Sequence, residues 1–401
     1  MAAGESEVRA AVAAVEDPEL RRGLGELGMV RSVTSGRREV AVVVAVPVDR
    51  WPGTEELIGR VRAAVEPVAG RADVRVELAT MSDDERAEFH RRLATGPGGE
   101  PPPLSGPSSS TPHAHGHPDP GRAGPPGPLG HEQGRPNRFL APGSRTRVVG
   151  ISSGKGGVGK SSVAVNLAVA LAARGRDVGL LDADVYGFSA PKMLGVTRAP
   201  VAVDDLLVPP VAHGVRCLSM GFFVSDEQPV IWRGPMLHKA LQQFLVDAYW
   251  GEPDFLLVDM PPGTGDVALS LGQYLPRTEI VVVTTPQAAA QRVAQRSAYA
   301  AKRLKLAVRG VIENMSWFTG DDRTRYELFG SGGGEELAAA LEVPLLGQIP
   351  LVPALRQGGD AGVPVRVADP DGEAAVAFDA LATQVDDMGP ARIYRRELTV
   401  R

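Results

Sequence analysis

Cysteine is almost absent from this chain, which has one, Cys217, among 401 residues. A single thiol excludes an intramolecular disulfide framework, and it excludes a zinc or iron–sulfur site built from several cysteines of one chain. No apolar run is long enough to span a bilayer and no signal-peptide core follows residues 1–9, so we expect a cytoplasmic protein. The 43 basic and 48 acidic residues nearly balance, which argues against general binding to nucleic acid or to an anionic membrane.

Glycine and proline, by contrast, are concentrated in one segment. Residues 95–136 contain 10 glycines and 12 prolines but almost no large apolar side chains. Such a segment buries too little surface to offset the entropy lost on ordering. We therefore predict a small α/β sandwich domain, a disordered linker, a larger domain and a tail, at residues 1–93, 94–144, 145–385 and 386–401.

The larger domain alternates short apolar runs with helix-like stretches, which predicts an α/β fold with a mostly parallel sheet and helices on both faces. The predicted strands lie at residues 148–151, 178–181, 255–258, 280–283, 308–312 and 345–349. The predicted helices lie at residues 161–174, 235–248, 287–304 and 334–341. In the small domain the predicted order is helix, two strands, helix, strand and closing helix.

Residues 154–161 match the phosphate-binding pattern G-x-x-x-x-G-K-[ST] in full, between a predicted strand and a predicted helix. Glycines let successive backbone N–H groups turn toward phosphate oxygens, and the helix N-terminus adds partial positive charge. We expect Lys160 to reach the β- and γ-phosphates and the Ser161 hydroxyl to ligate Mg²⁺. The predicted nucleotide-binding loop is Gly154, Lys155, Gly156, Gly157, Val158, Gly159, Lys160, Ser161 and Ser162.

Acidic residues end two of the predicted strands. Asp182 and Asp184 follow one apolar run, and Asp259 follows another. Carboxylates at the carboxyl ends of parallel strands face the ligand crevice, and acids two residues apart point to the same side of an extended chain. We predict that Asp259 belongs to the Mg²⁺ shell. For Asp182 and Asp184, a pair that only caps a strand and opens a turn is the alternative.

Several motifs together resemble the Mrp/ApbC family, whose members are P-loop ATPases that act as iron–sulfur cluster carriers. The N-terminal Asp17-Pro18-Glu19-Leu20 is similar to the small iron–sulfur-assembly domain that often precedes this ATPase. The resemblance implies a P-loop NTPase fold, Mg-dependent ATP hydrolysis, and a homodimer that transfers clusters to apoproteins or works with assembly factors. The motifs in the larger domain are residues 154–162, 182–187, 230–236, 259–266 and 313–316.

The resemblance also implies roles for individual residues. Lys155 resembles the extra lysine of the deviant phosphate loop found in dimeric ATPases related to nitrogenase iron protein, where it reaches the partner's nucleotide. Lys155, Lys160 and Asp184 are therefore implied to be catalytic, with Asp184 orienting the attacking water. Asp182 is implied to belong to the metal environment, and Asn314 to recognise adenine through its amide. A solvated loop charge at Lys155 and a plain strand-end turn at Asn314 are the alternatives.

The chain departs from this family at the cluster site. Cluster-carrying members have C-x-x-C shortly after the segment that resembles residues 313–316, whereas residues 317–323 contain no cysteine. Cys217 lies among apolar neighbours, which is typical of a small core residue. We identify no iron–sulfur ligand in the chain, so a [4Fe–4S] cluster is expected to need ligands from a partner.

Two other functions remain open from the sequence. One is a positioning ATPase of the cell-division or chromosome-partition type. The sequence shows no evident basic DNA-binding face, which argues against this function. The other is an adaptor in which nucleotide acts only as a switch.

Overall fold

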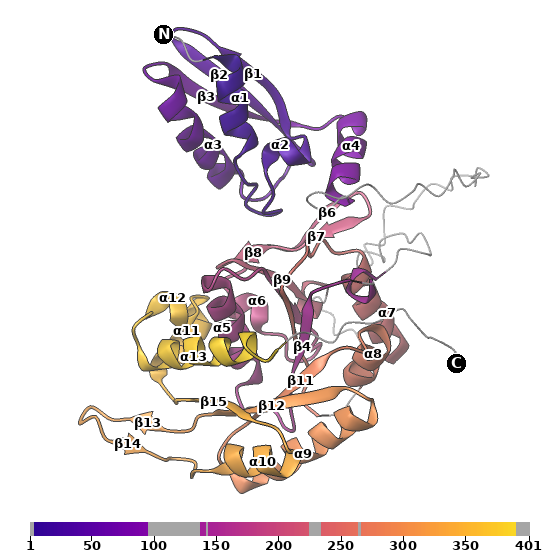
Figure 1. Cartoon of the computed structure of the whole chain (residues 1–401), viewed down its shortest axis with the longest axis vertical. Coiled ribbons are helices and arrows are strands. Elements are labelled where there is room, and N and C mark those ends of the chain that lie inside the picture. The colour runs from indigo at the N-terminus through magenta and orange to yellow at the C-terminus, as the bar shows by residue number, and fades with distance from the viewer. Residues whose placement is uncertain (1–3, 95–136, 142, 224–233, 264–265, 390–401) are drawn as a thin grey trace, which may run out of the picture. The chain divides into compact units, whose positions relative to one another are not determined.

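The structure is a computed structural model that describes residues 4–94, 137–141, 143–223, 234–263 and 266–389 (Figure 1). The glycine- and proline-rich part of the predicted linker, the end of the predicted tail and part of the family-like segment 230–236 lie outside the described residues. The chain forms two compact units. Among the described residues, the first unit comprises residues 4–94 and 201–208, and the second comprises residues 137–141, 143–200, 209–223, 234–263 and 266–389.

The N-terminal unit has a three-stranded sheet in the order β1-β2-β3, with β1 antiparallel and β3 parallel to β2. The parallel pair requires a crossover, and α3 supplies it. The predicted order of elements is confirmed, with α2 as an additional short helix. The elements are α1 (Glu5–Ala13), α2 (Leu24–Leu27), β1 (Val30–Ser35), β2 (Glu39–Val46), α3 (Thr54–Ala69), β3 (Asp73–Thr80) and α4 (Asp83–Ala94). This unit also includes the β6–β7 hairpin (Val201–Val203 and Leu206–Val208).

The second unit has an eight-stranded sheet in the order β15-β12-β11-β4-β10-β5-β9-β8. All neighbouring strands are parallel except the edge strand β8, which is antiparallel to β9. The mostly parallel sheet is therefore confirmed. Its strands are β4 (Arg147–Ser153), β5 (Val178–Asp182), β8 (Val211–Ala212), β9 (Val215–Ser219), β10 (Phe255–Asp259), β11 (Glu279–Thr284), β12 (Ala307–Asn314) and β15 (Leu345–Ile349).

Helices cover both faces of this sheet (Figure 1). Because side chains alternate along a strand, every second residue, such as Val149 and Ile151, joins the core beneath α5 and α13. On that face lie α5 (Lys160–Ala173), α6 (Ala190–Met193), α11 (Pro353–Ala361), α12 (Val365–Ala368) and α13 (Glu373–Asp386). The other face is covered by α7 (Gly234–Val246), α8 (Asp266–Tyr274), α9 (Ala288–Arg303) and α10 (Gly333–Leu341).

Three details of this unit bear on the predictions. Cys217 on β9 is fully buried and belongs to the core beneath α5, so its interpretation as a core residue is confirmed. At the far end of the predicted linker, residues 138–140 form a short 3-10 helix, η1, because Asn137 caps it and Phe139 is buried. In the described ranges, every helix is too short or too polar to cross a membrane.

Candidate nucleotide site

The phosphate loop connects the central strand β4 to α5, at the carboxyl edge of the sheet. At two positions of this loop the surroundings leave room only for glycine. A Cβ at Gly154 would overlap the backbone of α9 at Val293, and Gly159 has φ = 79°, with its Cβ position against the Asn314 amide. A larger residue at either position would displace a neighbouring element, so the loop is held between α9 and the end of β12.

Lys160 forms a buried ion pair with Asp259, whose side chains are 7% and 0% exposed. The second carboxylate oxygen, Asp259 Oδ2, is buried without a hydrogen-bond partner among the described residues. Burial raises the pKa of Asp259, and the Lys160 ammonium opposes that shift. Ser161 Oγ lies 3.4 Å from Lys160 Nζ. An unpartnered carboxylate oxygen beside a hydroxyl and a phosphate loop is a donor set that fits Mg²⁺.

Asp182 lies directly beside Asp259, because β5 and β10 pair in parallel with these two residues in register. Burial and the neighbouring Asp259 charge raise the pKa of Asp182 to about 7. Its carboxylate accepts hydrogen bonds at 3.0–3.3 Å from the N–H groups of Asp184, Ser189 and Ala190 and from Ser219 Oγ. Asp182 therefore holds the loop after β5 in place next to the Lys160–Asp259 pair.

Asp184 stands at the start of that loop and is 8% exposed. Its Oδ1 accepts hydrogen bonds from the N–H groups of Tyr186 (3.3 Å) and Gly187 (3.0 Å), which closes a tight turn. Its charge also contributes to the raised pKa of Asp259. The structure thus gathers three carboxylates, Asp182, Asp184 and Asp259, of which Asp259 pairs with the phosphate-loop lysine.

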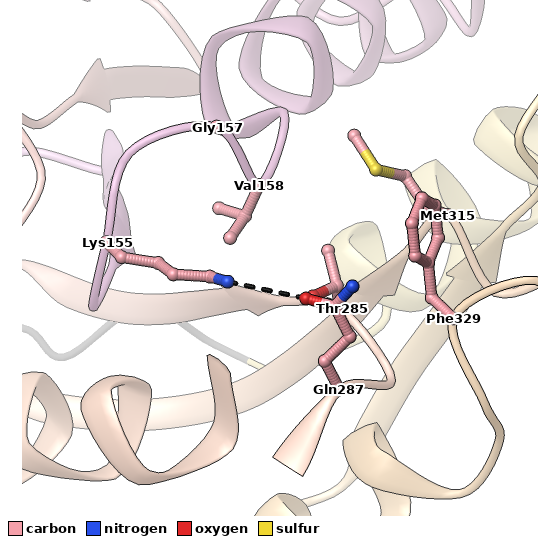
Figure 2. Close-up of a pocket in the computed structure, with 7 residues that line it drawn as sticks. All are labelled: Lys155, Gly157, Val158, Thr285, Gln287, Met315 and Phe329. Carbon is pink, nitrogen blue, oxygen red and sulfur yellow. Dashed lines mark hydrogen bonds between the residues drawn. The ribbon is translucent and has the colours of Figure 1, made fainter. Parts of the chain in front are cut away.

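Asn314 and Lys155 both contact parts of the chain near the loop. Asn314 is 5% exposed, and its Nδ2 donates to the carbonyl oxygen of Val158 at 2.9 Å. The amide donor that we expected at adenine therefore stabilises the phosphate loop in this structure. Lys155 Nζ donates to Gln287 Oε1 at 3.4 Å, as Figure 2 shows. Lys155 is thus partly buried and makes a hydrogen bond to a residue of its own chain.

Sequence reasoning did not identify every residue that shapes this edge. The Gly263 N–H donates to the Ser153 carbonyl at 2.9 Å, and Ser297 Oγ donates to the Gly263 carbonyl at 3.3 Å. The loop after β10 is therefore tied to both the phosphate loop and α9. Gly263 lies in the motif 259–266 that the sequence had singled out, whereas Thr285 and Gln287 were missed. Their place between the strand predicted at 280–283 and the start of the helix predicted at 287–304 was a signal that they would lie at this edge.

The segment where the family places its cysteines forms a hairpin of β13 (Phe318–Thr319) and β14 (Arg325–Tyr326). Glu373, at the start of α13, accepts hydrogen bonds from Trp317 Nε1 at 2.7 Å and from Thr319 Oγ1 at 2.8 Å. The Arg325 guanidinium lies 4.4 Å from the centroid of the Trp317 ring. The polar contacts to Glu373 therefore fix this hairpin to α13, and the cation–π contact joins two parts of the hairpin segment to each other.

Comparisons with known proteins agree with this geometry. Residues 144–386 match the model of the family described as NUBPL iron-transfer P-loop NTPase, and residues 5–78 match that of the iron–sulfur cluster assembly protein. The chain is 44% identical over 371 residues to the iron–sulfur cluster carrier protein of Mycobacterium tuberculosis, covering 91% of this chain and 88% of that protein. It is 38% identical over 355 residues to the carrier protein of Bacillus subtilis, covering 86% and 88%.

Among solved structures, a nucleotide-binding protein from Archaeoglobus fulgidus in complex with ADP is 33% identical and covers 57% of this chain and 90% of its own, with a TM-score of 0.49. The family matches together span both units of the chain. They also confirm the resemblance drawn from the sequence motifs. This chain belongs to the NUBPL iron-transfer P-loop NTPase family and carries an N-terminal domain of the iron–sulfur cluster assembly type.

Proposed function

We propose that this protein is an Mg-dependent ATPase that carries iron–sulfur clusters, works as a cytoplasmic homodimer and delivers clusters to apoproteins or assembly factors. The observation that carries the nucleotide chemistry is the buried Lys160–Asp259 pair at the phosphate loop, with Asp259 Oδ2 unpartnered in the described structure. The cargo is supported by relatives named iron–sulfur cluster carrier proteins, which match about nine-tenths of this chain.

The proposed cycle begins with nucleotide binding. The backbone N–H groups of residues 154–160 hold the phosphates, and Lys160 exchanges its bond to Asp259 for the β- and γ-phosphate oxygens. Asp259 is then available, with Ser161, to hold Mg²⁺. When bound, Mg²⁺ supplies positive charge that offsets the charge developing on the phosphates during transfer.

In the proposed hydrolysis step Asp184 orients the attacking water, which its position next to the Lys160–Asp259 pair supports. The loop after β10 would respond to loss of the γ-phosphate, because Gly263 is hydrogen-bonded to Ser153 at the entrance of the phosphate loop. Lys155 leaves Gln287 and reaches the partner subunit's nucleotide, so that closing of the dimer depends on ATP.

The proposal is tested by an anaerobic transfer assay with the full chain. A [4Fe–4S] donor, ATP and Mg²⁺ are supplied together with the apo form of a [4Fe–4S] enzyme, with and without a low-molecular-weight thiol. We expect ATP turnover in all samples, and transfer faster than from the donor alone when ligands from the acceptor or the thiol are present. Turnover without any acceleration of transfer would refute the carrier role, and absence of turnover would favour the nucleotide-switched adaptor.

One observation favours a second candidate, the positioning ATPase. Helix α9 contains four basic and no acidic residues, and its Arg292, Arg296 and Arg303 are exposed at spacings that place them on one side of the helix. In the described part of the chain none of the three has an ion-pair partner. Such a row of cations could hold an anionic surface, and duplex DNA is the probe to use.

We expect no ATP-dependent co-sedimentation of the wild-type protein with duplex DNA at physiological salt. If co-sedimentation is found, the variant Arg292→Glu/Arg296→Glu should lose it. The matched control is Arg37→Glu/Arg38→Glu, which reverses two exposed arginines of the N-terminal unit. Loss in the α9 variant alone would establish the second candidate in place of the first.

A further inference from the structure

A small cleft lies beside the phosphate loop, between that loop and the segments that follow β11 and β12 (Figure 2). Its volume is about 110 Å³, which is room for several atoms of water size at about 10–15 Å³ each. Sites for drug-sized ligands occupy about 300–1,000 Å³, so the cleft admits a short side chain or a small acid but not a nucleotide. It is lined by Lys155, Gly157, Val158, Thr285, Gln287, Met315 and Phe329.

One wall of the cleft holds a hydroxyl that the fold does not use. Thr285 is 4% exposed, yet its Oγ1 has no hydrogen-bond partner among the described residues. Valine has the same shape and would avoid the cost of a buried, unpaired hydroxyl. The fold therefore gives this hydroxyl no partner among the described residues, and Thr285 is one of the residues that line the cleft.

Two further donors accompany this hydroxyl. The Lys155 ammonium group donates one of its three N–H bonds to Gln287 Oε1 at 3.4 Å, so two N–H donors remain. Because this bond uses the oxygen of the Gln287 amide, its N–H₂ group is also still a donor. Among the described residues that line the cleft, Lys155 alone carries a charge. Three donors and a single positive charge select an acceptor-rich group of charge −1.

The opposite wall is apolar. Met315 and Phe329 line it, and Figure 2 shows these two side chains across the cleft from Lys155, with Val158 of the phosphate loop as a further apolar lining residue. Met315 also has φ = 58°, in the left-handed region that non-glycine residues rarely adopt, so its backbone is held in a costly conformation at this point. The cleft thus pairs an anion-binding end with an apolar end.

We propose that this cleft binds an aliphatic carboxylate of the size of a glutamate side chain. The carboxylate oxygens accept from Lys155, Gln287 and Thr285, and the methylene groups contact Val158, Met315 and Phe329. A phosphate group fits this site less well, because it carries more charge than one lysine balances and has no methylene chain for the apolar wall. The inference does not depend on the proposed function, since it concerns the apo protein alone.

The test is a titration of the full chain, without nucleotide, followed by NMR of ¹³C-labelled methionine methyl groups. Met315→Leu assigns the Met315 signal. Butyrate should shift that signal saturably, whereas its neutral isostere butyramide should not. Thr285→Val should weaken butyrate binding by about tenfold or more, because it removes a hydrogen bond to a charged group. Thr285→Ser, which keeps the hydroxyl, should bind nearly as the wild type does.

Two further probes identify the source of the carboxylate. Glutamate with both its amino and carboxyl groups capped represents an acidic side chain of a protein partner, with capped glutamine as its control. Binding of capped glutamate supports a protein partner, and binding of butyrate with exclusion of capped glutamate supports a free small acid. The proposal is overturned if no probe gives a saturable shift, if butyramide binds as butyrate does, or if inorganic phosphate binds more tightly than butyrate.

A last comparison guards against misfolded variants. Thr285→Val should raise the thermal midpoint of the apo protein, since it removes an unpaired buried hydroxyl. If that variant does not fold, Lys155→Gln supplies the same test by removing the charge, and it should lose butyrate binding. A Lys155→Gln protein that binds butyrate as the wild type does would refute the assignment.

Discussion

Replacing Lys160 by methionine tests the central ion pair directly, because the substitution keeps an unbranched side chain only one atom shorter and removes its charge. In the apo protein the lysine neutralises Asp259, whose side chain is 0% exposed and already has one unpartnered oxygen in the described structure. Without the ammonium group, the carboxylate is buried with no opposite charge. Breaking a buried pair in this way costs about 3–5 kcal/mol.

The loss should be visible in both stability and binding. Urea unfolding followed by tryptophan fluorescence should show a midpoint lowered by roughly 1 M or more, given slopes of about 1–3 kcal/mol/M. ATP binding, measured by equilibrium titration, should be abolished because the phosphates lose their positioned cation. Lys192→Met, at an exposed lysine of α6, is the matched control, and surface changes of this kind usually stay within about 0.5 kcal/mol.

A double variant separates the charge effect from general damage. Adding Asp259→Asn to Lys160→Met removes the uncompensated charge and should recover most of the lost stability, but not ATP binding. A midpoint equal to wild type in the single variant would show that Asp259 is not buried in solution. No recovery in the double variant would show that packing, not charge, causes the loss, and unchanged ATP affinity would refute the phosphate-loop assignment.

Three further predictions follow from single contacts. Asp184→Asn keeps the shape and the turn but removes the charge that orients water, so ATP binding should persist while turnover falls, by about 10²–10⁴-fold in a single-turnover assay. Gly154→Ala should lower the thermal midpoint because its Cβ overlaps α9, whereas Gly156→Ala, with no atom within 4 Å, should not. Burial raises the pKa of Asp17, which accepts a hydrogen bond from Trp51 Nε1 at 2.9 Å. A raised folded-state pKa means that stability is greatest below the unfolded-state pKa and falls as pH rises through the folded value, and Asp17→Asn should flatten that dependence of the urea midpoint.

The regular elements of the second unit could be predicted because their signal is local. The predicted runs of β4, β5, β10 and β11 are short, mostly apolar and bounded by polar residues, so composition and length predict them. In β12 and β15 the apolar run is interrupted, by Arg309 and Gly310 and by Gly347 and Gln348, but enough apolar residues remain to predict a strand. The phosphate loop could be predicted for the same reason, since its glycines and lysine are consecutive. Strand β9 shows what local patterns do not predict. It has only five residues, and its position in the sheet is determined by its pairing with β5.

The contacts that complete the site could not be predicted, because they join residues far apart in the sequence. Lys155 and Gln287 are 132 positions apart, and Trp317 and Glu373 are 56 apart. Both pairs meet only because the sheet order brings the loops after β4 and β11 together and sets β12 near α13. Asn314 illustrates the same point: its amide chemistry was evident, but its partner, the Val158 carbonyl, is fixed by the tertiary fold.

The single cysteine affects the two parts of the proposed function, ATP hydrolysis and cluster ligation, differently. Cys217 is fully buried on β9, opposite Leu180 of β5, and burial raises the pKa of its thiol well above the usual value, so it is a poor source of thiolate. Two copies of this chain offer only two such thiols, and a [4Fe–4S] cluster ordinarily takes four. In the segment after Asn314, where cluster-carrying family members have C-x-x-C, this chain has a hairpin whose Trp317 and Thr319 donate hydrogen bonds to Glu373. None of the residues proposed for ATP hydrolysis depends on a thiolate, so we expect the homodimer to hydrolyse ATP without a cluster, and we propose that cluster ligation draws on a client or a small thiol.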